Sequence, residues 1–397
     1  MAFAWETKYC ERVNGMYGSM TRQLMHLIAD PEVISFGGGL PAWDLFPVAQ
    51  VKEITNDILD SDGPAALQYG TSEGYKPLRQ AVAERYRKRG FDITEDNVLI
   101  TCGSQQGIDL VSKLFLDKGA TVVVGDPTFL TALQTFSLFQ ARCLTVPLDE
   151  EGAKVDLLPE ILEKNDVKFI YEMPNFQNPS GLTLSLERRK KLVEIARHYG
   201  VPILEDDAYG ELRYSGEAWP ALKALDKGQQ VIYLGSFSKI LSPGLRVSAL
   251  IAPMEVMEKL VFAKQAADLH TDNLAQRIVY EFMRRELLDP HIQVIIKSYR
   301  QRRDAMLQAM ERYFPPGVSW TKPDGGIFLW VTLPQGMDAM QLFEKAIQAR
   351  VAYVPGSCYY ANGGGENQLR LNFSACDEEK IEVGIQRLAK VITENLK

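Results

Sequence analysis

The sequence predicts an α/β fold in which a large, mostly parallel wound sheet of seven strands is followed by a small α+β domain. Two observations predict this fold. From about Val51, short β-branched runs alternate with amphipathic stretches, which is the pattern that βαβ units produce. Near Pro290 the pattern changes, and a long charged helix is followed by shorter strands and helices.

The expected strands of the large domain are short, and several are apolar on both faces, as strands covered by helices on both sides should be. They are Val98–Thr101, Thr121–Gly125, Leu144–Leu148, Lys168–Glu172, Val201–Leu204, Val231–Gly235 and Val247–Ala252. Between them, apolar residues at three- and four-residue steps predict helices. The clearest are Lys76–Arg89, Gln105–Lys118 and Leu186–Tyr199.

The second unit is expected to begin with one long helix over His291–Tyr313. Alternation then predicts the strands Phe328–Leu333, Val351–Val354 and Leu369–Phe373, with helices at Met340–Ala349 and Glu378–Asn395. We therefore divide the chain into an N-terminal segment (1–50), a large domain (51–290) and a small domain (291–397). The glycine-rich stretch Ser35–Pro41 suits a loop that approaches a ligand or another backbone closely.

Composition and spacing argue against several classes of protein. The 44 Lys and Arg residues against 51 Asp and Glu give a net charge of −7, without a block of like charges, so no nucleic-acid partner is expected. No apolar run reaches the length of a membrane span, and the N-terminus lacks a signal-peptide pattern. Five scattered cysteines favour a reduced, cytoplasmic protein, and four scattered histidines predict no metal site.

Hydroxyls, a lysine and an arginine follow one buried strand. Lys239 comes directly after the strand, where desolvation or neighbouring positive charge frees an amine to form a Schiff base with an aldehyde cofactor. Ser236, Ser238 and Arg246 suit a phosphate dianion. The alternative interpretation is a loop with a solvent-exposed lysine and a surface arginine.

Carboxylates follow another buried strand, in the run Glu205–Tyr209. Open α/β sheets bind ligands at this end of their strands. An aspartate there can hold the protonated ring nitrogen of an aromatic cofactor, and a tyrosine three residues later can reach a ring oxygen. Metal binding and helix capping are the alternatives.

Two weaker signals are compatible with the same kind of site. Ser104, Gln105 and Gln106 stand between a strand and a helix, whose first amides form an anion site. Phe129 follows the next strand and suits stacking on a flat cofactor. Such turns are common and a lone Phe is usually part of the core. Neither segment contains a dinucleotide-binding or Walker loop, which disfavours nucleotide ligands.

Four motifs occur in an order that resembles the fold-type-I pyridoxal-phosphate enzymes, specifically class I/II aminotransferases. They are Leu67–Gly70, Asn178–Gly181, Asp206–Tyr209 and Ser236–Lys239, the last followed by Pro243–Arg246, and Arg370 within Leu369–Ser374 completes the set. A narrower resemblance, to the 2-aminoadipate (LysN-like) and kynurenine aminotransferase branch, is carried by Ser35–Pro41, Gly103–Gln106, Asn175–Pro179 and Ala361–Asn367. The family more often has Thr at the position of Ser180, a change from which little consequence is expected.

The resemblance implies the roles of the site residues toward pyridoxal 5'-phosphate. Lys239 would form the Schiff base, Asp206 would pair with the pyridinium nitrogen, and Asn178 and Tyr209 would hydrogen-bond the ring oxygen. Phe129 would stack on the ring. The remaining cofactor contacts would be Ser104, Gln105, Gln106, Ser236, Ser238, Arg246 and Tyr69, with Tyr69 supplied by the partner subunit. The resemblance therefore implies a homodimer with shared active sites.

The resemblance also implies a ping-pong transamination from an L-amino acid to 2-oxoglutarate. Lys239 would move the α-proton, and Arg370, with Asn178, Gly38 and Tyr69, would bind substrate. Arg22, on a mobile N-terminal helix, would meet acidic side chains and swing outward for leucine-like or aromatic ones; the alternative is an ordinary exposed arginine.

Two alternatives stay open for the reaction. One keeps the cofactor and changes the chemistry to that of a racemase, β-lyase or decarboxylase. The other is a pyridoxal-phosphate-sensing regulator, for which a helix-turn-helix module is expected ahead of the wound domain. Only about fifty residues precede that domain here.

Overall fold

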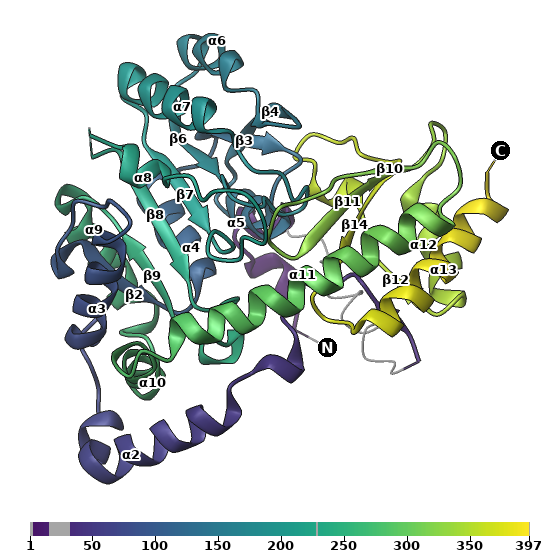
Figure 1. The fold of residues 1–397 in the computed structure, drawn as a ribbon. Helices are drawn as coiled ribbons and strands as arrows, with labels where there is room; N and C mark the ends of the chain where they lie inside the picture. Colours follow the sequence, from purple (N-terminus) through teal and green to yellow (C-terminus); the bar gives the residue numbers. More distant parts are fainter. Residues whose placement is uncertain (1–2, 16–31, 228, 397) are drawn as a thin grey trace.

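The computed structural model describes residues 3–15, 32–227 and 229–396, and its central feature is a sheet with the strand order β2-β9-β8-β7-β6-β3-β4-β5 (Figure 1). The strands are β2 (Val98–Thr101), β3 (Thr121–Asp126), β4 (Arg142–Asp149), β5 (Gly152–Ala153), β6 (Val167–Glu172), β7 (Ile203–Asp207), β8 (Val231–Ser236) and β9 (Ser248–Ile251).

All seven expected strands are present in this sheet, but the expected total of seven is wrong. The sheet has an eighth strand, β5, which pairs antiparallel with β4 across a tight turn. A strand of two residues is too short to show a periodic pattern of apolar residues, so β5 could not be predicted from the sequence. The pairs from β4 through β8 are parallel, whereas β9 is antiparallel to both of its neighbours.

Alternate residues of the central strands enter two different apolar clusters, one on each face of the sheet. On one face, Val122 and Val124 pack with Ile108 and Val111 of α4. On the other, Val123 packs with side chains of α7. Burial on both faces explains why these strands read as continuous apolar runs. The helices of this part are α2 (Val48–Ala66), α3 (Lys76–Arg87), α4 (Ser104–Phe115), α5 (Leu130–Leu138), α6 (Leu158–Lys164), α7 (Leu186–Tyr199), α8 (Leu222–Leu225), α9 (Met254–Asp268) and α10 (Asn273–Arg284).

Local signals set the ends of α7, which spans the residues expected for it. Ser185 caps its first turn by accepting a hydrogen bond from the Arg188 backbone N–H. Gly200 ends it with a left-handed φ of 67°, which a residue without a Cβ adopts at low cost. Short 3₁₀ turns occupy Trp5–Lys8, Glu11–Gly15, Trp43–Leu45, Glu95–Asn97, Val155–Leu157, Pro243–Leu245 and Gly356–Tyr359.

A long helix, α11 (Leu288–Tyr313), connects the large sheet to a second, smaller one. In Figure 1 it runs from beside α10 to the small sheet, where it packs against α13 (Glu378–Glu394). The small sheet is antiparallel, in the order β10-β11-β14-β13, and α12 (Ala339–Gln348) completes this part. Its strands are β10 (Ser319–Trp320), β11 (Phe328–Thr332), β13 (Val354–Pro355) and β14 (Gln368–Asn372).

The strand expected over Val351–Val354 is split between two sheets. Its first half, β12 (Val351–Ala352), pairs in parallel with β1 (Ile34–Ser35), and its second half is β13. Tyr353 separates the two, and its buried hydroxyl donates to the Ala339 carbonyl oxygen at 2.6 Å. The β1–β12 pair brings the early glycine-rich loop beside the C-terminal part of the chain. We keep the division at residues 50 and 290 as a proposal.

Within the described ranges, every helix is too short or too polar to span a lipid bilayer.

The contact between β1 and α13 leaves no room for a side chain at Gly384. A Cβ there would lie 2.5 Å from Phe36 Cζ and 2.9 Å from Ile34 Cγ2. Gly384→Ala should therefore lower the free energy of unfolding by about 1–3 kcal/mol, because the packed core must move apart. Urea unfolding of the purified variant measures this.

The matched control is Gly63→Ala in α2, where a new Cβ meets nothing within 4 Å. This change should be neutral or stabilise by up to about 1 kcal/mol, because alanine has the higher helix propensity. Equal destabilisation by both variants would contradict the steric explanation.

Candidate active site

The ends of the parallel strands, the early glycine loop and the small sheet together enclose a cavity of about 310 Å³. Ligands of wound α/β proteins bind at this edge of the sheet. Of the residues expected at the site, the cavity lining includes Gly38, Ser104, Gln105, Phe129, Asn178, Asp206, Tyr209, Ser236, Ser238, Lys239, Arg246 and Arg370.

Three expected residues are not part of this lining. Gln106 is engaged elsewhere: its Oε1 accepts hydrogen bonds from the Cys102 backbone N–H and from Lys264 Nζ, each at 2.8 Å, and its Nε2 donates to Asp268. Gln106 therefore stabilises the loop at Cys102 and does not face the cavity. Tyr69 is 77% exposed and lies edge-on to His270. Arg22 and the helix expected around it lie outside the described residues.

Lys239 follows β8 and its Nζ donates to the Gly39 carbonyl oxygen at 2.7 Å, across the cavity. Burial, and after it the positive charges of Arg370 and Arg246, together lower the pKa of this amine to about 8. A larger share of Lys239 is therefore the neutral, nucleophilic amine near neutral pH than is usual for a lysine.

Asp206, near the end of β7, has one carboxylate oxygen bonded and one unbonded. Tyr171 on β6 donates to Oδ2 at 2.8 Å, whereas the buried Oδ1 has no hydrogen-bond partner among the described residues. Burial raises the pKa of Asp206 to about 6, although the Tyr171 hydrogen bond acts in the opposite direction. A buried acceptor without a donor is unusual, and the protonated ring nitrogen of pyridoxal phosphate fits it.

A cradle of hydroxyls and backbone N–H groups surrounds the first turn of α4. Ser248, which the sequence reasoning missed, lies 3.2 Å from Ser236 Oγ and 3.4 Å from Ser104 Oγ. Arg246 donates to the Cys102 carbonyl oxygen at 3.1 Å. Gly103 has φ of 75°, and a Cβ there would overlap the Arg246 guanidinium. Hydroxyls, a guanidinium and a helix N-terminus are the donors that a phosphate dianion prefers.

Arg370, on β14, also lines the cavity. Its Nη1 donates to Asn178 Oδ1 at 2.8 Å and its Nη2 to the Gly37 carbonyl oxygen at 2.6 Å. The guanidinium carbon lies 4.1 Å from the ring centroid of Phe328 and 5.2 Å from that of Tyr359. The sequence reasoning missed both aromatic residues, because nothing in their local pattern separates them from core residues.

Comparison with known proteins agrees with this geometry. The sequence model of the family described as aminotransferase class I and II matches residues 31–388. The aromatic-amino-acid aminotransferase 1 of Thermococcus litoralis is 46% identical over 99% of this chain and 96% of its own. The kynurenine aminotransferase of Pyrococcus horikoshii superposes with a TM-score of 0.96 at 44% identity, covering 99% of each chain.

The α-aminoadipate aminotransferase LysN of Thermus thermophilus, solved with N-(5'-phosphopyridoxyl)-L-leucine, superposes with a TM-score of 0.93 at 42% identity, again over 99% of each chain. Fold and site thus define a fold-type-I enzyme that depends on pyridoxal phosphate. The chain belongs to the class I and II aminotransferase family and is an aminotransferase.

The electrostatic environment of Lys239 is testable in the protein freed of cofactor. Competitive labelling of amines at increasing pH, followed by mass spectrometry, should give a midpoint near pH 8 for Lys239, against about 10.4 for an ordinary lysine. Arg370→Met should raise the Lys239 midpoint, because a neighbouring positive charge disfavours the ammonium form. A midpoint that does not respond to Arg370→Met would show that this neighbour does not act on the amine.

Proposed function

We propose that the enzyme transfers the amino group of an L-amino acid, namely 2-aminoadipate or a leucine-like or aromatic one, to 2-oxoglutarate by a ping-pong reaction. The supporting observation is Arg370, a buried cation flanked by the rings of Phe328 and Tyr359. The cation suits the α-carboxylate that all these substrates share. The printed names of the relatives above include aromatic, aminoadipate and kynurenine substrates.

Bound pyridoxal phosphate supplies an electron sink for negative charge that develops at the substrate Cα. Asp206 would keep a proton on the ring nitrogen through its unbonded Oδ1. Asn178 and Tyr209 would hydrogen-bond the ring oxygen, and Phe129 would stack on the ring. The residues that would hold the phosphate are Ser104, Gln105, Ser236, Ser238 and Arg246.

Lys239 moves the proton. Its lowered pKa raises the share of neutral amine, and this amine would accept the proton from the substrate Cα at Nζ and hold it for the return transfer. Arg370 fixes the α-carboxylate, so that the Cα–H bond, and not another bond, faces Lys239. In the second half of the reaction the same groups act in reverse order on the 2-oxo acid.

The side-chain end of the substrate lies beside the loop Gly37–Leu40, whose residues line the cavity. Gly38 leaves room for the substrate to approach the backbone. The proposed role of Arg22, which pairs with acidic side chains and moves aside for apolar ones, remains the hypothesis for dual specificity.

A panel of amino donors tests the proposal. With 2-oxoglutarate as acceptor, 2-aminoadipate, leucine, phenylalanine and kynurenine should each yield glutamate, and initial rates should give the parallel double-reciprocal lines of a ping-pong reaction. Arg370→Ala should slow both half-reactions about a hundredfold or more, because both substrates lose their carboxylate contact. Damage to one half-reaction alone, or failure of all these donors, would contradict the proposal.

The enzyme is proposed to be a cytoplasmic homodimer in which Tyr69 completes the partner's active site. All five cysteines are free, which suits a reducing compartment. Tyr69 is an exposed aromatic residue outside the cavity of its own chain. Large exposed aromatic residues are typical of protein interfaces.

Mixed dimers test the sharing of sites. The Lys239→Ala homodimer should be nearly inactive, and the Tyr69→Ala homodimer should have weakened activity. A hybrid of the two contains one site with an intact Lys239 and an intact Tyr69 from the other subunit, and should recover roughly half the wild-type activity. If Tyr69 served the cavity of its own chain, the hybrid would be no better than the Tyr69→Ala protein.

A further inference from the structure

The end of β7 carries two neighbouring aspartates with different surroundings. Successive side chains of a strand point to opposite faces of the sheet, and of these two residues only Asp206 lines the cavity. The side chain of Asp207 is 1% exposed. Unlike Asp206, it has a donor for each of its oxygens.

One oxygen of Asp207 joins two loops. Its Oδ1 accepts hydrogen bonds from the Gly210 backbone N–H at 2.9 Å and from Asn175 Nδ2 at 3.0 Å. Gly210 belongs to the turn that carries Tyr209, and Asn175 belongs to the loop that carries Asn178. The two loops that carry the side chains proposed to meet the cofactor's ring oxygen are thus joined through the same atom.

The orientation of Asn175 is set from its other side. Arg189 on α7 is fully buried and donates to Asn175 Oδ1 at 2.6 Å and to the Pro174 carbonyl oxygen at 2.7 Å. With Oδ1 taken by Arg189, the amide nitrogen of Asn175 faces Asp207. Arg189 therefore makes the bridge to Asp207 directional.

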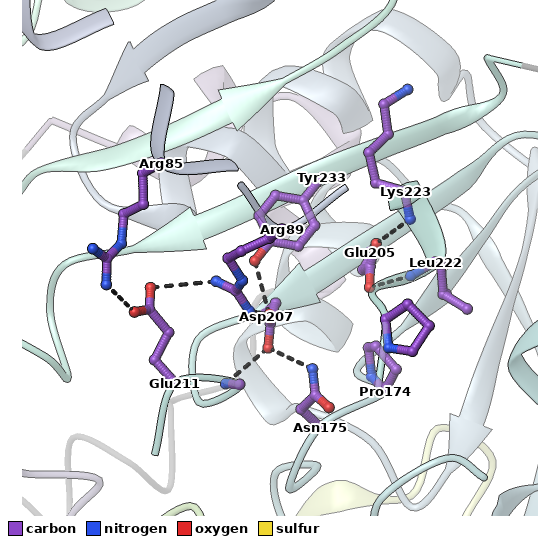
Figure 2. Close-up of polar contacts among 12 residues, drawn as sticks. Arg85, Arg89, Pro174, Asn175, Glu205, Asp207, Glu211, Leu222, Lys223 and Tyr233 are labelled. Atoms are coloured by element: carbon purple, nitrogen blue, oxygen red, sulfur yellow. Dashed lines mark hydrogen bonds and ion pairs between the residues drawn. The ribbon is translucent and has the colours of Figure 1, made fainter. Parts of the chain in front are cut away.

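The other oxygen of Asp207 has a different task. Tyr233 donates to Oδ2 at 2.8 Å, and Arg89 Nη2 lies 3.9 Å away. Glu211, in the turn after β7, pairs with Arg85 and Arg89. Figure 2 shows the contacts of Glu211 with these two arginines and those of Asp207 with Tyr233 and Asn175. Oδ2 and Glu211 thus balance the charge of the two partly buried arginines, while Oδ1 connects the loops.

We propose that Asp207 is a positioning residue: its Oδ1 sets the separation of Tyr209 and Asn178 and thereby the strength of their hydrogen bonds to the cofactor's ring oxygen. This inference rests on the proposed cofactor roles of Tyr209 and Asn178. The loop-joining role belongs to one oxygen atom and not to the negative charge of the carboxylate. Substitutions can therefore remove the oxygen atom and the charge separately.

Three variants separate the atom from the charge. Asp207→Asn keeps an oxygen that can accept from Gly210 and Asn175 but removes the charge. Asp207→Ala removes both. Tyr233→Phe removes the hydrogen bond to Oδ2 and the one between the Tyr233 and Tyr86 hydroxyls, leaves both donors of Oδ1 in place, and is the matched control. A fourth variant, Gly210→Ala, keeps the charge but displaces the oxygen, because a Cβ there would overlap the carboxylate of Asp207.

Hydrogen exchange of the cofactor-free protein tests the joining of the loops without reference to function. In Asp207→Ala and Gly210→Ala, amides of residues 175–178 and 207–211 should exchange about tenfold or more faster, since hydrogen bonds to an ionised acceptor are lost. In Asp207→Asn and Tyr233→Phe they should stay within about threefold of wild type.

The visible absorption of bound pyridoxal phosphate tests the consequence at the cofactor. Hydrogen-bond donors to the ring oxygen stabilise the deprotonated form of the bound cofactor. Weaker hydrogen bonds from Tyr209 and Asn178 should therefore raise the pH midpoint of the absorption change by about half a unit or more. Asp207→Ala and Gly210→Ala should show this rise, whereas Asp207→Asn should keep the midpoint of the wild-type protein.

Three results would overturn the proposal or its link to the cofactor. If Asp207→Asn matched Asp207→Ala in both measurements, the charge and not Oδ1 would be responsible. If Asp207→Ala left exchange unchanged, the loops would not depend on Asp207. If exchange became faster but the absorption midpoint did not shift, the link to the cofactor would be wrong. The loops would then still be joined by Asp207, and the error would lie in the proposed roles of Tyr209 and Asn178. If Asp207→Ala does not fold, Gly210→Ala gives the same readings.

Discussion

The buried guanidinium of Arg370 is the interaction on which the arrangement of the site depends. A charge removed from water must be hydrogen-bonded to be tolerated, and the two acceptors of Arg370 come from distant parts of the chain. Gly37 precedes it by 333 residues and Asn178 by 192. The early glycine loop, the loop after β6 and the small sheet therefore cannot take their places independently. The same side chain that joins them presents the cation that defines the carboxylate end of the site.

Local charge, and not the net charge of −7, determines the chemistry of the cavity. Lys239, Arg246 and Arg370 line it together, and the two arginines depress the pKa of the lysine. Under the proposed function, a phosphate beside Arg246 and a carboxylate beside Arg370 would place an anion against each arginine. Asp206 is the opposite case, because burial raises its pKa and a protonated ring nitrogen is the partner that would stabilise its charged form.

Much of the fold and of the site could be predicted, because strands buried on both faces leave a strong pattern and because binding residues follow strand ends. The prediction was less successful where contacts depend on distant residues. Gln105 and Gln106 are neighbours in the first turn of α4, yet consecutive helical residues point about 100° apart. Gln105 faces the cavity, while Gln106 meets Lys264 on α9. Tyr171, the partner of Asp206, lies inside a strand and resembles any core residue in sequence.

The pair Asp206–Asp207 shows how one strand serves binding and support at once. Alternation sends adjacent carboxylates to opposite faces, and what each face offers decides the role. Tyr233, Asn175 and the Gly210 backbone donate to the two carboxylate oxygens of Asp207, so neither oxygen remains available to a ligand. On the cavity side only Tyr171 bonds Asp206 within the described residues, so one buried oxygen remains available. Burying an unsatisfied acceptor destabilises the cofactor-free protein. A cofactor nitrogen that donated to Asp206 Oδ1 would return that free energy, so the incomplete hydrogen bonding of β7 would contribute to affinity for the cofactor.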